Sequence, residues 1–307
     1  MLDETQVAQF HRDGYLNGGP VLSAGEVAEL RDSLEAILAR GPDGFGAGER
    51  RPVLFRDLGS GDADGKAGAT PVWQIVNIWE AAEAFERLLY HPDVVTAIHQ
   101  LTGHRDLQVW HDQIQYKPAG HGGATRWHQD APLWPILRPM TPVSAWLPLD
   151  DADEENGCMW MVPGSHAWGD QMDYLRTCGH LTAREEFGRL EGFTPPAEAE
   201  VREVVPRSWP VRAGEVSFHH SLTWHGSPAN RSSRPRRAIA IHYMTGEARF
   251  DARGEHVMKQ FVALADGAPM AEAGPHFPRV FQAGHPVGAP ARARPAPRQN
   301  PPQPGAA

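Results

Sequence analysis

The chain has 307 residues, of which 41% are hydrophobic and 22% are charged, as in a globular protein with a substantial core. This composition excludes a disordered, collagen-like or coiled-coil chain, and two cysteines exclude a disulfide framework. The net charge of −9 argues against nucleic acid or an anionic membrane as partner. We expect a cytoplasmic protein, because the sequence has no signal-peptide pattern and no apolar run near the roughly 20 residues of a membrane helix.

Helical periodicity dominates the N-terminal part of the chain, from about residue 3 to 101. The clearest helix begins with a Ser-x-x-Glu capping box at Ser23, carries apolar residues on one face and meets a glycine at Gly41. The helices that we expect are 3–12, 23–41 and 81–101, the last with a break at Pro92. Residues 41–70 are rich in Gly, Asp and Arg, which predicts an exposed loop.

From about residue 105 to 250 the pattern changes to short extended segments separated by Pro, Gly and Asp. The strands that we expect are 107–117, 143–149, 159–162, 215–220 and 236–243. On the first strand, alternation places His111, Gln113 and Lys117 on one face, which suits a strand that lines a polar cavity. Because no helices alternate with these strands, we expect a mainly β fold, an antiparallel sandwich or barrel with flanking N-terminal helices.

The domain organisation predicted from these patterns is one domain over residues 1–282 and a separate C-terminal segment. Residues 283–307 hold seven prolines and three arginines, no acidic residue and no periodicity. Such a composition predicts a disordered tail. The sequence leaves the oligomeric state open.

Four His-x-Asp triplets raise the question of a metal site. A mononuclear non-haem iron(II) site needs two imidazoles and one carboxylate on one face of the metal. On an extended segment, residues i and i+2 point the same way, so one triplet supplies two of these ligands. The triplets begin at His11, His91, His104 and His128. The first three fall in predicted helices, helix ends or turns, and only His128-Gln-Asp130 lies in the β region.

The second imidazole must come from a strand that is distant in sequence. Three histidines are available on the extended segments that follow Gly214, namely His219, His220 and His225. Spacing alone does not separate them.

The order of several motifs carries a family resemblance. After His128-Gln-Asp130 come Val-Ser-Ala-Trp146, Asn156-Gly-Cys, Pro163-Gly-Ser-His and His225-Gly-Ser-x-x-Asn-x-Ser, with Arg236 eleven residues beyond His225. Together with the N-terminal Phe10-His-Arg-Asp-Gly-Tyr-Leu segment, this set resembles the phytanoyl-CoA dioxygenase family from about residue 5 to 250.

The resemblance implies an iron(II)- and 2-oxoglutarate-dependent oxygenase on a double-stranded β-helix, a jelly-roll or cupin-like barrel, with dioxygen as second cosubstrate. It implies that the iron ligands are His128, Asp130 and His225. The residues that it assigns to 2-oxoglutarate are Gln113, Trp146, Ser227 and Arg236, the last as clamp of the distal carboxylate. A guanidinium suits that role because it matches a carboxylate with two parallel donors.

Two further arginines, Arg234 and Arg237, lie close to Arg236 in the sequence. A strand register shifted by one residue would assign the binding of the distal carboxylate to a neighbour of Arg236. If Arg236 points inward, alternation makes Ala238 and Ala240 point inward too, which leaves room beside the cosubstrate.

The reaction that the resemblance implies is oxidation of an unactivated C–H bond of a small molecule, with release of succinate and carbon dioxide. Halogenating relatives carry a small residue in place of Asp130, so its presence favours hydroxylation. The substrate contacts that we expect are His111, Lys117 and Trp134, and a secondary-metabolite intermediate is the favoured substrate class. The alternatives are a metal-dependent redox-neutral jelly-roll enzyme (a lyase or isomerase) and a non-catalytic metal-binding module.

Overall fold

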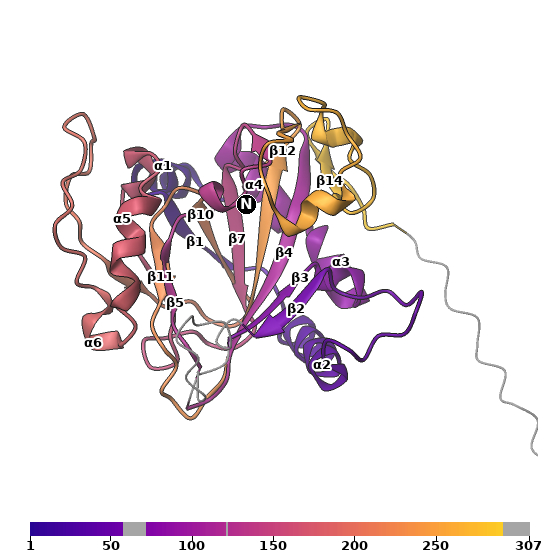
Figure 1. Ribbon diagram of the computed structural model, residues 1–307, viewed down its shortest axis with the longest axis horizontal. Coiled ribbons are helices and arrows are strands. Elements are labelled where there is room, and N and C mark those ends of the chain that lie inside the picture. Colours follow the sequence, from indigo (N-terminus) through magenta and orange to yellow (C-terminus); the bar gives the residue numbers. More distant parts are fainter. Residues whose placement is uncertain (58–71, 121, 291–307) are drawn as a thin grey trace, which may run out of the picture.

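Two antiparallel sheets frame the molecule in the computed structural model, which describes residues 1–57, 72–120 and 122–290. The strands of the large sheet, in spatial order, are β1 (Tyr15–Pro20), β10 (Glu215–His220), β7 (Val143–Pro148), β12 (Arg236–Thr245), β4 (Leu107–Lys117), β14 (Arg279–Gln282) and β15 (His285–Pro286), with β3 (Trp73–Val76) also on β4 and β2 (Leu54–Asp57) on β3. The central strands stand side by side in Figure 1.

The small sheet carries the strands that matter most for the site. Its order is β5 (Thr125–His128), β11 (His225–Ser227), β8 (Met159–Met161) and β9 (Arg207–Trp209). A two-stranded sheet joins β6 (Leu137–Arg138) to β13 (Arg249–Phe250). Together the sheets form the jelly-roll fold expected from the motif order.

Four helices pack against one face of the large sheet: α1 (Glu4–Asp13), α2 (Ala24–Arg40), α3 (Glu83–Leu89) and α4 (Pro92–Thr102). The other two, α5 (Met172–Thr177) and α6 (Arg184–Phe187), pack with Trp127 of β5 in the small sheet. The predicted capping box at Ser23 is present, and α4 begins at Pro92, the predicted break. Within the described residues, no helix has the length and apolarity needed to cross a membrane.

The apolar core determines which face of the large sheet is left for a site. Leu34 of α2 and Ile98 of α4 share one cluster of buried residues with Ile239 and Ile241 of β12. The alternating residues Ala238 and Ala240, with His242, lie on the other face, as expected from the period of a strand. The polar interior therefore faces the small sheet, and the helices lie outside.

Several elements differ from the sequence prediction. The predicted strand 107–117 and the other four strands are present, but β1, β2 and β3 were expected as helix, loop or connection. β1 contains Asn-Gly-Gly-Pro, a turn-like sequence, and is held extended by pairing with β10. Strand β15 lies within the segment predicted to be disordered and pairs with β14. Residues 291–307, and 58–71 of the predicted loop, lie outside the described residues.

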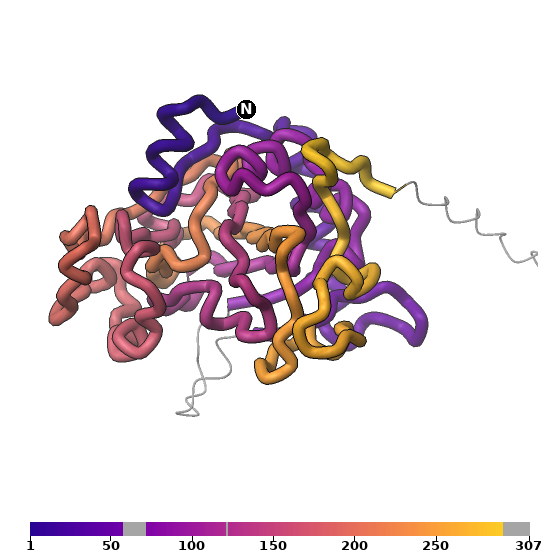
Figure 2. The backbone as a smooth tube through the Cα atoms, turned by 90° about the horizontal axis from the view of Figure 1, so that it is seen from above, coloured from indigo at the N-terminus to yellow at the C-terminus, as the bar shows by residue number. Residues whose placement is uncertain are grey.

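The segment that follows β12 packs across the large sheet at the side away from α5 and α6. Figures 1 and 2 both show this segment, in gold and yellow, opposite the salmon segment that carries those helices. Its residues Phe250, Met258 and Phe277 share a buried cluster with Trp110 of β4. Residues beyond the predicted barrel, such as Met258 and Phe277, therefore pack against β4.

Candidate metal centre

Two imidazoles meet where β5 and β11 pair. His128 and His225 are directly opposite each other in this antiparallel ladder, and their ring centroids lie 4.1 Å apart. Directly opposite residues on one face of a ladder are close neighbours, so the pairing alone brings the rings together. One ligand atom from each of these histidines and one from Asp130 lie within 4.8 Å of one another.

Asp130 reaches this point by a turn and not by strand alternation. β5 ends at His128, and Asp130 has helical backbone angles at the start of a short 3-10 helix. The amides of Asp130 and Ala131 both donate to the carbonyl oxygen of Ser221, at 2.9 and 3.0 Å. The intervening Gln129 is buried and donates its side-chain amide to the carbonyls of Gly169 and Leu222. These bonds hold the carboxylate beside the two rings.

The hydrogen bonds of the two imidazoles determine which nitrogen is free. Nδ1 of His128 lies 2.8 Å from the carbonyl oxygen of Arg126, and Nδ1 of His225 lies 2.9 Å from that of Thr223. A carbonyl only accepts, so each Nδ1 carries the proton and each Nε2 of a neutral ring offers a lone pair. The two Nε2 atoms lie 3.5 and 3.6 Å from Oδ1 of Asp130.

The second carboxylate oxygen of Asp130 is held from the opposite side. Oδ2 accepts a hydrogen bond from Ser144 Oγ at 3.1 Å and one from His219 Nε2 at 3.0 Å. Burial alone would raise the pKa of Asp130, but the neighbouring His225, His128 and His219 outweigh burial and hold this pKa well below its ordinary value. The carboxylate is therefore ionised and presents Oδ1 to the rings.

This donor set fits a divalent transition metal. Two imidazole nitrogens with their protons directed to backbone carbonyls, and one ionised carboxylate, make the two-histidine, one-carboxylate set that leaves coordination positions open on iron(II). Within the described residues, no other group of three such side chains converges in this way.

A buried cation stands at the far end of the interior. Arg236 begins β12, is fully buried, and donates from Nη2 to Ser227 Oγ at 3.1 Å, while its Nε has no partner in the described part of the chain. Burial lowers the pKa of Arg236 to about 10. The Trp146 ring lies 5.7 Å from the guanidinium carbon. A buried guanidinium that has no carboxylate partner is suited to bind an anionic ligand.

The neighbouring arginines point elsewhere. Arg237 faces outward and forms a bidentate ion pair with Asp150, at 2.8 and 2.7 Å, and a contact with Glu35 at 2.7 Å. Arg234 is exposed and pairs with Asp153. Only Arg236 of the three is fully buried, and its contacts Ser227 and Trp146 line a small cavity together with His128, Asp130 and His225.

A larger cavity of about 530 Å³ opens on the other side of the metal centre. His128 and Asp130 form part of its wall, as do His111 and Gln113 of β4 and Trp134. The remaining wall residues are mostly polar, among them Gln74, Gln115, Thr125, Thr182 and His242. Gln113 lines both this cavity and the small one beside Trp146 and Ser227, so it lies between the two.

Lys117 lies apart from this cavity, although it shares a face of β4 with His111. It is fully buried, and its Nζ donates to the carbonyl oxygens of Ser227 and Pro228, at 3.0 and 2.7 Å. The other expected substrate contacts, His111 and Trp134, are at the cavity, with ring centroids 5.4 Å apart.

Three residues that surround the metal centre were not predicted from the sequence. Ser144 and His219 bond to Asp130, and His242 bonds to Ser144 Oγ at 2.7 Å. For His242 a signal existed, because the alternation that turns Ala238 and Ala240 inward continues to it. His219 was available only as one of three equivalent histidines, and nothing local marks Ser144.

The family model described as phytanoyl-CoA dioxygenase (PhyH) matches residues 10–238. Phytanoyl-CoA dioxygenase domain-containing protein 1 of Bos taurus is 26% identical over 278 residues, which cover 79% of this chain and 90% of that protein. Ectoine dioxygenase of Bordetella parapertussis is 25% identical over 256 residues, which cover 80% and 76% of the two chains.

Two solved structures extend the comparison. The epimerase SnoN, in complex with Fe3+, alpha ketoglutarate and nogalamycin RO, has a TM-score of 0.66 at 26% identity and covers 90% of this chain and 97% of its own. The carbocyclase SnoK, from nogalamycin biosynthesis, has a TM-score of 0.63 at 26% identity and covers 91% and 97%. Because the family model matches most of the chain, this protein belongs to the phytanoyl-CoA dioxygenase family, and its cofactors are iron(II) and 2-oxoglutarate.

Proposed function

We propose that the chain is an iron(II)- and 2-oxoglutarate-dependent dioxygenase that hydroxylates a C–H bond of a small molecule. The observation that carries the proposal is the convergence of His128 Nε2, His225 Nε2 and Asp130 Oδ1 next to a cavity of about 530 Å³. In this proposal these three side chains hold the iron. When bound, iron and 2-oxoglutarate supply the activation of dioxygen, with release of succinate and carbon dioxide.

The cosubstrate is proposed to lie between the metal centre and Arg236. The guanidinium and the Ser227 hydroxyl would share its distal carboxylate, and Ser227 Oγ, which accepts from Arg236, still has its own proton to donate. Trp146 and Gln113 would flank it, since both line the small cavity with Ser227. A buried anion there would offset the cost of the buried guanidinium.

The substrate is proposed to occupy the larger cavity against His111 and Trp134. His111 is buried, its Nδ1 lies 3.2 Å from the carbonyl oxygen of Asp112, and its Nε2 has no partner in the described residues. Burial and the neighbouring His242 and His256 hold the pKa of His111 well below its ordinary value. The ring is therefore neutral with a lone pair on Nε2, which favours a substrate with a hydroxyl or amine donor.

Asp130 favours hydroxylation over halogenation, because on bound iron its carboxylate would take the coordination position that a halide needs. A second candidate comes from the likeness to SnoN and SnoK, an epimerase and a carbocyclase. Inversion of a carbon centre or ring closure would use the same iron ligands and cosubstrate, and would differ only in what becomes of the substrate.

Isotopically labelled dioxygen tests the two candidates. The purified chain, with iron(II), 2-oxoglutarate and a library of oxygenated secondary metabolites, is screened for compounds that stimulate succinate release, and each product is analysed by mass spectrometry. Hydroxylation predicts one labelled oxygen atom in the product. Products that gain no oxygen, with an inverted centre or a new ring, would instead assign the second candidate. Loss of turnover in Asp130→Ala is expected in either case.

A further inference from the structure

Lys117 occupies a position with an unusual set of partners. It is the last residue of β4 and is fully buried, and among the described residues its ammonium group donates to two backbone carbonyls, those of Ser227 and Pro228. Within the described part of the chain, no carboxylate lies within ion-pair distance of it. Burying a lysine ammonium group without an anion destabilises the folded protein, so a neutral side chain would serve better at this position if its role were structural alone.

The chain makes room for this lysine with glycines and an asparagine. A Cβ added to Gly122 would lie 2.6 Å from Lys117 Cβ, and one added to Gly157 would lie 3.6 Å from Lys117 Cδ. Asn230 donates its side-chain amide to the carbonyls of Lys117 and Pro118, at 3.2 and 3.0 Å. The packing therefore holds the aliphatic stem in one direction, toward the segment that follows His225.

The lysine and the clamp arginine are direct neighbours in the sheet. Lys117 of β4 is the antiparallel partner of Arg236 of β12, and the two side chains reach the same residue from different positions. Lys117 bonds to the carbonyl of Ser227, and Arg236 bonds to its hydroxyl. Two buried cations thus converge on one serine, and the described residues place no carboxylate beside either.

We propose that Lys117 is a positioning residue for the distal carboxylate of 2-oxoglutarate, because it fixes the Ser227–Pro228 backbone and adds a second positive charge at the Arg236 end of the interior. Burial, with repulsion from Arg236 as a smaller contribution, lowers the pKa of Lys117 in the absence of an anion. A bound carboxylate reverses that balance for both cations. This inference rests on the proposed placement of the cosubstrate and assigns to Lys117 a role other than substrate contact.

The test compares two ligands in the full chain loaded with manganese(II), which prevents turnover. 2-Oxoglutarate has a distal carboxylate, whereas 2-oxobutyrate keeps the 2-oxo acid group and lacks it. In Lys117→Met, calorimetry is expected to show 2-oxoglutarate binding weakened by roughly tenfold or more, while 2-oxobutyrate and manganese(II) bind as in the unmodified chain. Lys117→Gln, whose amide retains hydrogen-bond donors, is the second variant if Lys117→Met does not fold, and the same selectivity is expected at a smaller loss.

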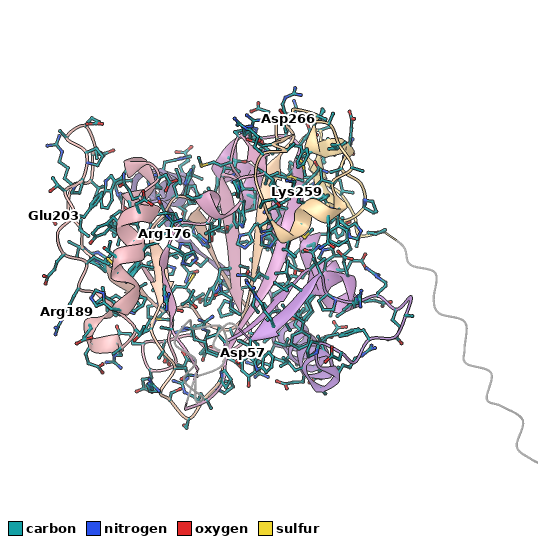
Figure 3. The ribbon with its side chains drawn as sticks, in the orientation of Figure 1. Asp57, Arg176, Arg189, Glu203, Lys259 and Asp266 are labelled. Atoms are coloured by element: carbon teal, nitrogen blue, oxygen red, sulfur yellow. The ribbon has the colours of Figure 1, made fainter. Side chains whose placement is uncertain are left out.

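The matched control is Lys259, labelled in Figure 3 on the C-terminal segment. It also donates to two backbone carbonyls, those of Ala252 and Gly254, at 3.0 and 2.8 Å. Lys259→Met is expected to leave the affinity for both ligands unchanged.

Three results would overturn the proposal. One is unchanged affinity for 2-oxoglutarate in both Lys117 variants, and another is an equal loss for the two ligands, which would mean a general packing role. The third is that the losses of 2-oxoglutarate affinity in Lys117→Met and Ser227→Ala multiply fully in the double variant. If Lys117 acts through Ser227, Lys117→Met should weaken binding less once the Ser227 hydroxyl has been removed. Failure of the unmodified chain to bind 2-oxoglutarate would be a different result, and it would count against the proposed function itself.

Discussion

Replacing Arg236 with Met should change stability and cosubstrate affinity in opposite directions. Burial lowers the pKa of Arg236 from 12.5 to about 10, which corresponds to roughly 3 kcal/mol against the charged form in the ligand-free protein. Removal of the charge relieves that cost and loses two hydrogen bonds, one to Ser227 Oγ at 3.1 Å and a long one to the carbonyl oxygen of Gln115 at 3.5 Å, together worth about 1–2 kcal/mol. The free energy of unfolding without ligand should therefore stay level or rise by up to about 2 kcal/mol.

The affinity for 2-oxoglutarate should fall steeply in the same variant. A guanidinium that holds a carboxylate with two charge-assisted hydrogen bonds contributes about 3–4 kcal/mol, so the dissociation constant should rise by roughly 100-fold to 1,000-fold. Calorimetric titration of the manganese(II)-loaded protein measures the affinity, and urea unfolding of the same preparation without ligand measures the stability.

Arg237 is the matched control, one residue away on the outer face. Arg237→Met breaks the bidentate pair with Asp150 and should cost about 2–4 kcal/mol of stability while the affinity for 2-oxoglutarate stays unchanged. The proposed role of Arg236 would be wrong if Arg236→Met were destabilised as much as Arg237→Met, or if it bound 2-oxoglutarate as tightly as the unmodified chain.

Two further predictions concern Ser144, beside the metal centre, and His256, which stacks on the cavity-wall residue His111. Ser144→Ala removes the hydroxyl that bonds to Asp130 Oδ2, so iron(II) affinity in an anaerobic titration should fall by roughly 10-fold to 100-fold, whereas Ser217→Ala, which removes a buried hydroxyl bonded to Trp209, should have no effect. Burial lowers the pKa of His256 to about 4, so the unfolded chain binds more protons than the folded one between about pH 4 and 6.5, and stability should fall as the pH drops through that window. His256→Asn should reduce the difference between the unfolding free energies at pH 7 and pH 4.5, measured with urea, by about 2 kcal/mol. An unchanged difference in the variant would contradict the lowered pKa of His256.

The central strands could be predicted because their signals are local. The alternation on Leu107–Lys117 and the turn residues around Glu215–His220 are present in the sequence itself, and both strands have the predicted bounds. β1 could not be predicted, because Asn17 and the following glycines form a strand only through their pairing with β10. The same holds for β2, whose partner is β3.

At the candidate site, motif order identified residues that the structure then brings together, but local pattern gave only part of the geometry. Alternation predicts the face of β4 on which Lys117 lies. It does not predict which element lies opposite that end of β4, so the contact of Lys117 with Ser227 could not be predicted. The backbone at Asp130 is held by hydrogen bonds from the amides of Asp130 and Ala131 to the carbonyl oxygen of Ser221, which is 91 residues further along the chain. His256 stacks on His111, with ring centroids 5.4 Å apart, from a segment beyond the family match.

An anaerobic titration of the purified chain with iron(II), followed by addition of 2-oxoglutarate, tests the proposed metal centre directly. We expect one iron per chain and, on addition of 2-oxoglutarate, a weak visible charge-transfer band, both of which are lost in His225→Ala. An unmodified protein that is folded yet retains no stoichiometric iron, or that binds iron and gives no band with 2-oxoglutarate, would contradict it.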